Sequence, residues 1–232
     1  MGDYFDFKLI FDYLPELLSR LHITLILLIT ATIIGMSLGA VIALLRLYKI
    51  PVLNQISVVF ISFMRGTPIL VQMFIVYYGL PRVLLLIGLD INRWDKFIFV
   101  ILTYGFNMAA FVAEIIRGAI ISVPIGQTEA AYSAGLTRLQ AFRRIVAPQA
   151  LLSALPSLSV NVVYLLQDTS IAFSLGIIDV MGQAKVIGAR TYHTLESYTG
   201  AAVIFLVLCI ILEKGCSKME KKLTERMIGD GR

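Results

Sequence analysis

The sequence predicts an all-α, polytopic membrane protein with about five transmembrane helices in a single domain over residues 1–232. Two observations carry this prediction: 58% of the residues are hydrophobic and only 15% are charged, and long apolar runs recur along the whole chain. A soluble domain has about a quarter of its residues charged, whereas a helix that crosses a bilayer needs about 20 apolar residues. Five such helices and their connections use most of the chain, which excludes an ordinary water-soluble enzyme, a disordered chain and a small secreted protein.

The charge balance carries information about topology rather than about a ligand. The chain has 20 Lys and Arg against 15 Asp and Glu, a net charge of +5. In a soluble protein this excess would favour nucleic acid, but in membrane proteins basic residues collect in the cytoplasmic loops. Cys209 and Cys216 have no cluster of potential ligands around them and predict free thiols. The first 18 residues carry four acidic residues and one lysine, so we expect no cleaved signal peptide.

We expect the spans at residues 17–47, 55–86, 97–121, 150–178 and 198–212. In the first span, Gly35 and Gly39 form a G-x-x-x-G pair that allows close approach of another helix. In the second span, Pro68 is expected to bend the helix because it removes one backbone hydrogen bond. The segment 179–197 is too polar to span, and the last run is long enough only if its acidic flanks lie at the interfaces.

The third and fourth spans carry unusual polarity. The third contains Asn107, Glu114 and Arg117, and the fourth contains Asn161 and Asp168. Glu114 and Arg117 are three residues apart, so they share a helix face and can pair. Polar groups at membrane depth are costly and usually face a cavity or a partner, which makes these side chains candidates for function.

The distribution of Lys and Arg predicts the orientation of the spans. We place the basic tail in the cytoplasm, with Lys214, Lys218, Lys221, Lys222, Arg226 and Arg232. Five spans then put the loops 46–54 and 117–149 inside and the N-terminus outside. With Arg65 counted alongside these loops and the tail, the inside contains thirteen Lys and Arg and the outside seven, which favours an external N-terminus and a cytoplasmic C-terminus.

Residues 122–149 form the one long amphipathic segment, which we name the coupling segment. It predicts two short helices around Gly135, the second starting with an S/T-x-x-Q capping box of Thr137 and Gln140. Leu139, Phe142 and Val146 fall at i, i+3 and i+7 and form an apolar stripe. This stripe requires either a groove on a partner protein or a place on the lipid surface.

A spaced motif favours the partner protein. The coupling segment reads Glu-Ala-Ala, three residues, Gly, nine residues, Ile, two residues, Pro. This pattern resembles the EAA loop of ABC importer permeases, a cytoplasmic helix that docks into a cleft of the ATP-binding subunit. The resemblance assigns the ATPase-coupling role to Glu129, Ala130, Ala131, Gly135, Arg143 and Pro148. Two of these have simpler explanations as well: Glu129 as an acid at a helix N-terminus, and Arg143 as part of the basic cytoplasmic bias.

The resemblance extends over most of the chain. The stretches FMRGTPILVQMFIVYYGLP (63–81), AAFVAEIIRGAIISVPIGQTEAAYSAG (109–135), APQALLSALPSL (147–158) and QDTSIAFSLGIIDVMGQAKVI (167–187) are similar to the polar amino acid subfamily, the histidine, glutamine and cystine type. This implies a type I ABC importer permease fold. The subfamily commonly has Lys where this chain has Gln167, which leans slightly toward cystine or another uncharged polar amino acid.

The resemblance also implies the partners. These are a dimer of ABC ATP-binding subunits, a second permease copy or a similar chain, an extracytoplasmic substrate-binding protein, the amino acid and membrane lipid. The sequence contains no G-x-x-x-x-G-K-[ST] loop, so we expect ATP to be used by the partner ATPase, with no cofactor on this chain. The histidines His22 and His193 are isolated, and no catalytic or metal-binding set is present in the sequence. We therefore expect a transport subunit and not an enzyme.

The polar residues of the spans are the predicted substrate-binding set: Gln72, Asn107, Asn161, Asp168, Glu114 and Thr67. A zwitterionic amino acid needs acceptors for its ammonium, from Asp168 or Glu114, and donors for its carboxylate, from the amides and the backbone freed near Pro68. The alternative for each is a hydrogen bond between helices. A passive channel or a membrane scaffold remains the alternative for the whole chain.

Overall fold

The computed structural model describes the backbone of residues 5–229 and the side chains of residues 5–225, and this part of the chain consists of helices joined by short turns and loops, with no strand. Basic-tail residues Arg226 and Arg232 lie outside the described side chains. The elements are α1 (Phe7–Leu18), α2 (Leu21–Leu47), α3 (Leu53–Gly66), α4 (Ile69–Leu85), α5 (Lys96–Ile121), α6 (Ile125–Ser133), α7 (Arg138–Ala141), a π-helical turn (Phe142–Val146), α8 (Ala147–Asp168), a 3-10 turn (Thr169–Leu175), α9 (Val180–Thr191) and α10 (Thr194–Gly229).

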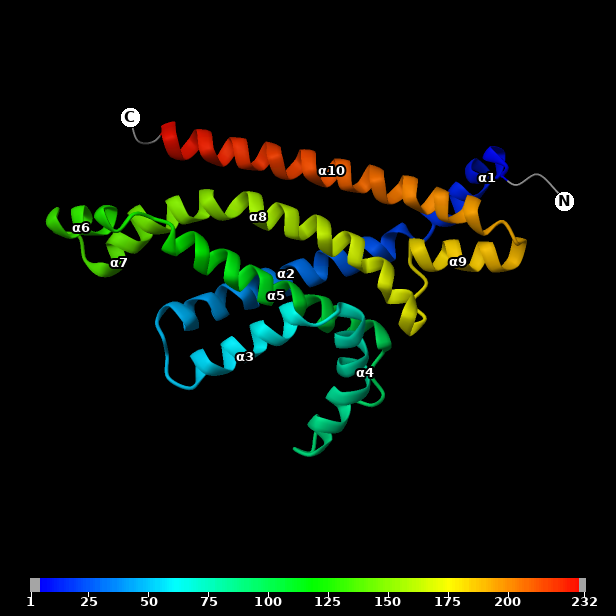
Figure 1. The fold of residues 1–232 in the computed structure, drawn as a ribbon, viewed down its shortest axis with the longest axis horizontal. Coiled ribbons are helices and arrows are strands. Elements are labelled where there is room, and N and C mark those ends of the chain that lie inside the picture. The colour runs from blue at the N-terminus through cyan, green and yellow to red at the C-terminus, as the bar shows by residue number, and fades with distance from the viewer. Residues whose placement is uncertain (1–4, 230–232) are drawn as a thin grey trace.

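Four helical segments are long and apolar enough to cross a membrane: Leu21–Leu47, Lys96–Ile121, Arg138–Leu175 and Thr194–Glu225. The shorter apolar helix Ile69–Leu85 adds a fifth hydrophobic element. The all-α membrane architecture is therefore confirmed. The long helices run side by side, with α6 and α7 at one end of the molecule and α1 and α9 at the other (Figure 1).

Helices α2 and α5 form the centre of the bundle. The buried core joins Leu27 of α2 to Tyr104 and Met108 of α5. Gly35 and Gly39 are both buried in this contact, and a Cβ atom on Gly39 would lie 2.8 Å from the carbonyl oxygen of Ala109. The G-x-x-x-G pair thus allows the backbones of α2 and α5 to approach closely.

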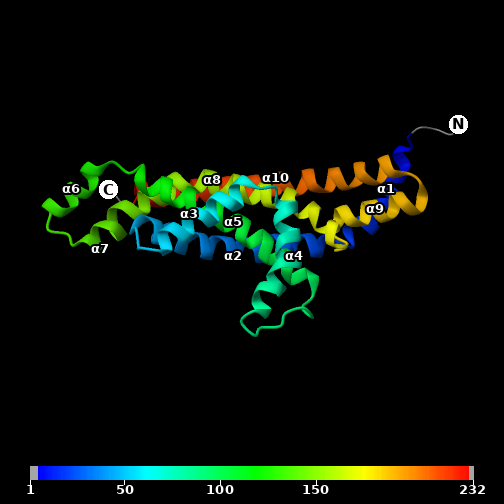
Figure 2. The same cartoon turned by 60° about the horizontal axis from the view of Figure 1, so that its bottom comes forward.

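The second predicted span is two helices and not one bent helix. We name the break between α3 and α4 the elbow, formed by Gly66, Thr67 and Pro68. Thr67 is extended (φ −124°, ψ 149°), because the residue before a proline is sterically excluded from the helical region. After the elbow α4 turns away from the bundle, as both views show (Figures 1 and 2).

Two other boundaries differ from expectation, whereas the prediction that segment 179–197 does not span agrees with the structure. The first run begins with a separate helix, α1, which ends at Leu18 before α2 starts at Leu21. The last helix begins at Thr194 and continues far beyond residue 212, because its polar ends favour helix as much as its apolar centre does. The polar segment 179–197 contains α9, which is too short and too polar to be among the candidate spans.

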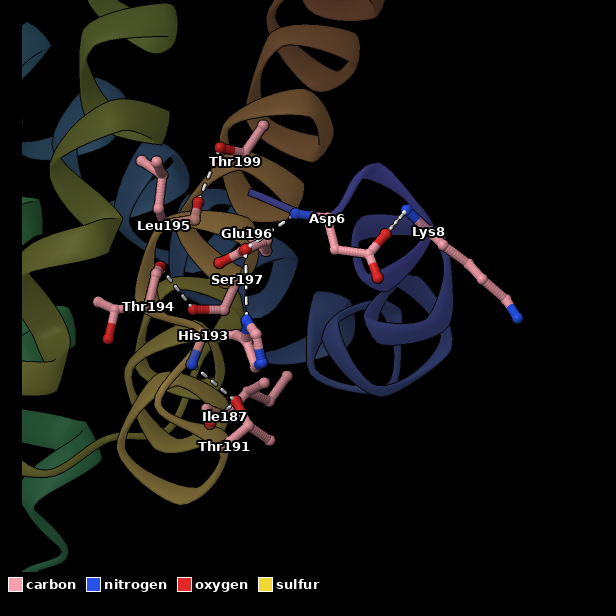
Figure 3. Close-up of polar contacts among 10 residues, drawn as sticks. All are labelled: Asp6, Lys8, Ile187, Thr191, His193, Thr194, Leu195, Glu196, Ser197 and Thr199. Atoms are coloured by element: carbon pink, nitrogen blue, oxygen red, sulfur yellow. Dashed lines mark hydrogen bonds and ion pairs between the residues drawn. The ribbon is translucent and has the colours of Figure 1, made fainter. Parts of the chain in front are cut away.

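Polar contacts join the chain's first helix to its last two. The backbone N–H of Asp6, the N-cap of α1, donates to Oε1 of Glu196 at 3.1 Å, and Nδ1 of His193 lies 3.3 Å from the same oxygen (Figure 3). Glu16 of α1 pairs with Arg190 of α9 at 2.7 Å. These contacts fasten α1 to α9 and α10 at the end of the molecule opposite α6 and α7.

Candidate functional site

The coupling segment folds as two short helices around a glycine, as the sequence predicts. Helix α6 follows Pro124, and the chain turns at Gly135, whose φ is +81°. Most residues with a Cβ atom are strained at this φ, so glycine is favoured at the turn.

The second helix of the coupling segment starts with the predicted capping box. The backbone N–H of Thr137 donates to Oε1 of Gln140 at 2.9 Å, and the N–H of Gln140 lies 3.4 Å from Oγ1 of Thr137. Helix α7 has only four residues but passes through the π-helical turn directly into α8. The second half of the coupling segment and α8 thus belong to one continuous helical stretch, Arg138–Leu175.

The predicted coupling residues lie mostly on the surface. Glu129, Ala130 and Arg143 are exposed, whereas Ala131 is buried and Pro148 is half-buried at the start of α8. The segment occupies one end of the molecule (Figure 2). Ala131 thus packs within the chain, while the exposed residues are available to a partner.

The apolar stripe of the coupling segment lies partly against the chain itself. Leu139, Phe142 and Val146 line a groove together with Leu47 and Tyr48 at the end of α2. Val146 is buried, but 64% of Leu139 is exposed. One edge of the stripe therefore seats the segment on the bundle, and the other edge is free.

Three of the predicted substrate residues meet at the elbow. Gln72, in the first turn of α4, is fully buried, and its Nε2 lies 2.8 Å from the carbonyl oxygens of Met64 and Thr67. Asn107 of α5 donates through Nδ2 to Oε1 of Gln72 at 3.0 Å and to the Met64 carbonyl at 3.3 Å. The two amides thus satisfy backbone carbonyls that the broken helix leaves without a helical partner.

Glu114 lies in a different cluster. Its carboxylate pairs with Arg117 one turn along α5, at 2.7 Å, and with Arg46 at the end of α2. The predicted pair of Glu114 and Arg117 is therefore present, and Arg46 joins it across the bundle. The Glu114 carboxylate, bound by two guanidinium groups, thus forms a salt bridge that links α2 to α5.

Asn161 and Asp168 lie on α8, and no hydrogen bond among the described residues joins them to the elbow. Nδ2 of Asn161 is buried and has no partner within the described part of the chain. The backbone carbonyl of Asp168 accepts a hydrogen bond of 2.9 Å from Tyr104, whereas its half-buried carboxylate forms no ion pair in the described residues. These two side chains thus keep unused hydrogen-bonding groups.

Residues 15–213 match the family described as "Binding-protein-dependent transport system inner membrane component". The chain belongs to this family. Its resemblance to amino-acid ABC permeases is confirmed by relatives of nearly the same length.

The L-cystine transport system permease protein TcyL of Bacillus subtilis (strain 168) is 44% identical to this permease over 219 residues, covering 94% of this chain and 92% of that protein. The probable amino-acid ABC transporter permease protein PatM of Vibrio harveyi is 36% identical, covering 97% and 99%. A crystal structure of an amino acid ABC transporter with histidines superposes with a TM-score of 0.83 at 34% identity, covering 95% of this chain and 100% of that one.

Three interaction partners of the predicted site residues are not predicted by the sequence of this permease. Arg46 lies 68 positions from Glu114, and Tyr104 lies 64 positions from Asp168. The Met64 carbonyl is a backbone group, which a side-chain pattern does not reveal. The one signal in the sequence is Pro68. It forces Thr67 into an extended conformation, so carbonyl groups nearby lose their helical partners and need other donors.

Proposed function

We propose that this permease moves a polar amino acid into the cell by alternating access, driven by ATP hydrolysis on a separate subunit. The observation that supports the proposal most directly is the coupling segment, with its exposed Glu129 and its continuous connection into α8. Residues 1–232 act as a single transmembrane domain of which the coupling segment is the cytoplasmic part. ATP binds to the partner ATPase dimer, and this chain needs no cofactor.

The partners follow from the number of spans. About five spans rarely enclose a pathway, so a second copy or a similar permease chain completes it, and a substrate-binding protein delivers the amino acid outside. The permease lies in the cytoplasmic membrane of a bacterium with its N-terminus outside and its C-terminus inside. The excess of Lys and Arg in the coupling segment, the 46–54 loop and the tail supports this orientation.

The proposed substrate is cystine or another uncharged polar amino acid. The named activity of the relative TcyL supports this choice, as does the neutral Gln167 before Asp168. Asp168 supplies the acceptor for the substrate ammonium, and Asn161 supplies a donor. Gln72, Asn107 and Thr67 shape the elbow beside the pathway. Glu114, enclosed by two arginines, contributes through the position of α5.

The test of coupling uses the permease expressed with its cognate ATPase. Glu129→Lys should abolish co-purification of the ATPase and reduce ATP-driven uptake to background, because it reverses the charge of an exposed residue of the docking helix. Gln127→Lys, two residues earlier and also exposed, should retain both. Normal uptake by Glu129→Lys would refute the proposed coupling role.

The substrate is tested by ATPase stimulation of the reconstituted complex with its binding protein across a panel of amino acids. An import system predicts stimulation by a few polar amino acids and no flux without ATP. Flux without ATP would indicate a passive channel. If the parent complex shows no uptake, and if Asn161→Leu and Asp168→Leu assemble with the ATPase as well as the parent does, the chain is a scaffold.

A further inference from the structure

Arg65 is an exposed cation in the last turn of α3, directly before the elbow. It follows Met64, whose carbonyl oxygen lies 3.3 Å from Nδ2 of Asn107. Asn107 is close to the midpoint of α5, a 26-residue helix long enough to span the membrane. This contact therefore sets the elbow, and Arg65 with it, near the middle of α5, so Arg65 does not belong with the cytoplasmic Lys and Arg counted from the sequence; the remaining twelve against seven favour the same orientation.

Arg65 forms no ion pair with any side chain in the described part of the chain, although it is near enough to Glu114 for the two charges to attract each other. Its guanidinium lies 5.3 Å from the centre of the Phe111 ring and forms none of the ion pairs found among the described residues. The nearest acid along this face of α5 is Glu114, three residues after Phe111, and both of its oxygens are engaged by Arg46 and Arg117.

An exposed guanidinium at this depth cannot face lipid tails without a large cost, so it faces a water-filled pathway or a partner. Anionic lipid headgroups lie at the membrane surface, some 15 Å away from the centre of the bilayer. The amide donors that could otherwise receive a carboxylate at the elbow are turned inward, since Gln72 and Asn107 both donate to groups within the chain.

We propose that the Arg65 guanidinium receives the carboxylate of the transported amino acid as it passes the elbow. The inference rests on the proposed function and adds to it the group that recognises the substrate's negative end. Arginine suits this role because its planar fork donates two parallel hydrogen bonds to a carboxylate.

The first test asks whether position 65 meets water. Cys209 and Cys216 are replaced by Ser, and Arg65→Cys is compared with Ile33→Cys in the assembled transporter. Ile33 lies near the middle of α2 and is 61% exposed on the single chain, so it matches Arg65 in depth. The polar reagent MTSET should label Arg65→Cys rapidly and Ile33→Cys hardly at all; equal resistance of both would overturn the proposal.

The second test asks whether the charge is needed. Uptake of radiolabelled L-cystine should fall about ten- to a hundredfold in Arg65→Gln, the range expected for loss of a charge-assisted hydrogen bond, and be largely retained in Arg65→Lys. After complete modification of Arg65→Cys, cationic MTSEA should restore uptake and anionic MTSES should not. Arg93→Gln, in the loop before α5, is the control and should transport normally.

The outcomes separate this inference from the proposed function. If the parent complex imports no amino acid in the panel, the proposed function fails. If the parent imports L-cystine and Arg65→Gln does so at the same rate, or if MTSES restores uptake as well as MTSEA, the import function stands and the role of Arg65 is refuted.

Discussion

The side chain of Asn107 donates a hydrogen bond of 3.0 Å to Oε1 of Gln72 and so connects the middle of α5 to the first turn of α4. Gln72 in turn donates to carbonyls on both sides of the elbow. The break in the second span is therefore held by side chains and is not a loose hinge. Any movement of α4 relative to α5 must break or rearrange this pair of amides.

Gln72→Leu should destabilise the permease, because the Met64 and Thr67 carbonyls would lose a buried donor. Each buried group left unsatisfied costs about 1–3 kcal/mol, so we expect a clear fall in the thermal midpoint of the purified complex and in uptake. Gln55→Leu makes the same change at an exposed position of α3 and should leave the midpoint unchanged. Equal midpoints for both variants would show that the amide pair does not stabilise the elbow.

The same amides show what the sequence does and does not predict. Hydrophobic runs predict α2, α5, α8 and α10 because length and hydropathy are properties of single segments. The capping box at Thr137 and the turn at Gly135 are equally local, and both are confirmed. The pairing of Gln72 with Asn107 is not local, since 35 positions separate them, and no pattern within one helix reveals it.

The elbow itself lies between these cases. Pro68 predicts that the helix of the second span is disturbed. The proline alone does not decide between a bent helix and two separate helices, because it removes the same backbone hydrogen bond in both cases. The break forms because Gln72 and Asn107 can satisfy the carbonyls that it exposes, and this depends on how α3, α4 and α5 pack. That these residues bind substrate directly stays a prediction from their polarity; the structure shows that each also has a hydrogen-bond partner within the chain.

Gly39→Ala should separate α2 from α5. The new Cβ atom would lie 2.7 Å from two carbon atoms of Val112 and 2.8 Å from the backbone oxygen of Ala109, so the helices must shift. Overpacking of this kind costs about 1–3 kcal/mol. Gly118→Ala is the control: its Cβ atom meets nothing within 4 Å, and alanine is favoured over glycine inside a helix by about 0.5–1 kcal/mol. A thermal midpoint that falls for Gly118→Ala but not for Gly39→Ala would contradict this account.

Gly135→Ala should impair coupling without weakening the membrane bundle. An alanine at φ +81° is strained by about 1–2 kcal/mol, which would change the angle between α6 and α7. We expect lower ATP-driven uptake at an unchanged thermal midpoint. Gly135→Asn should retain more uptake, because asparagine tolerates positive φ better, and Gly126→Ala on exposed α6 should be neutral. Equal uptake by the alanine and asparagine variants would argue against a conformational cause.

Asp179 offers a test at the other end of the bundle, where it caps α9. It is fully buried, Oδ1 accepts from the backbone N–H of Gly182 at 2.8 Å, and Oδ2 has no partner within the described residues. Burial raises the pKa of this carboxyl group, although hydrogen bonds from backbone N–H groups partly oppose the shift. The ionised Asp179 carboxylate therefore lowers the stability of the folded state at neutral pH.

Asp179→Asn should consequently be at least as stable as the parent at neutral pH, because asparagine keeps the capping oxygen and removes the charge. Asp179→Ala should lose about 1 kcal/mol, since the cap is removed. A raised pKa means that the folded state binds the proton more readily than the unfolded state, so the parent gains stability as the pH falls below the raised value. The difference between Asp179→Asn and the parent should therefore shrink as the pH of the thermal unfolding experiment is lowered. An asparagine variant as unstable as the alanine variant, or a difference independent of pH, would show that the carboxylate is better satisfied than its contacts indicate.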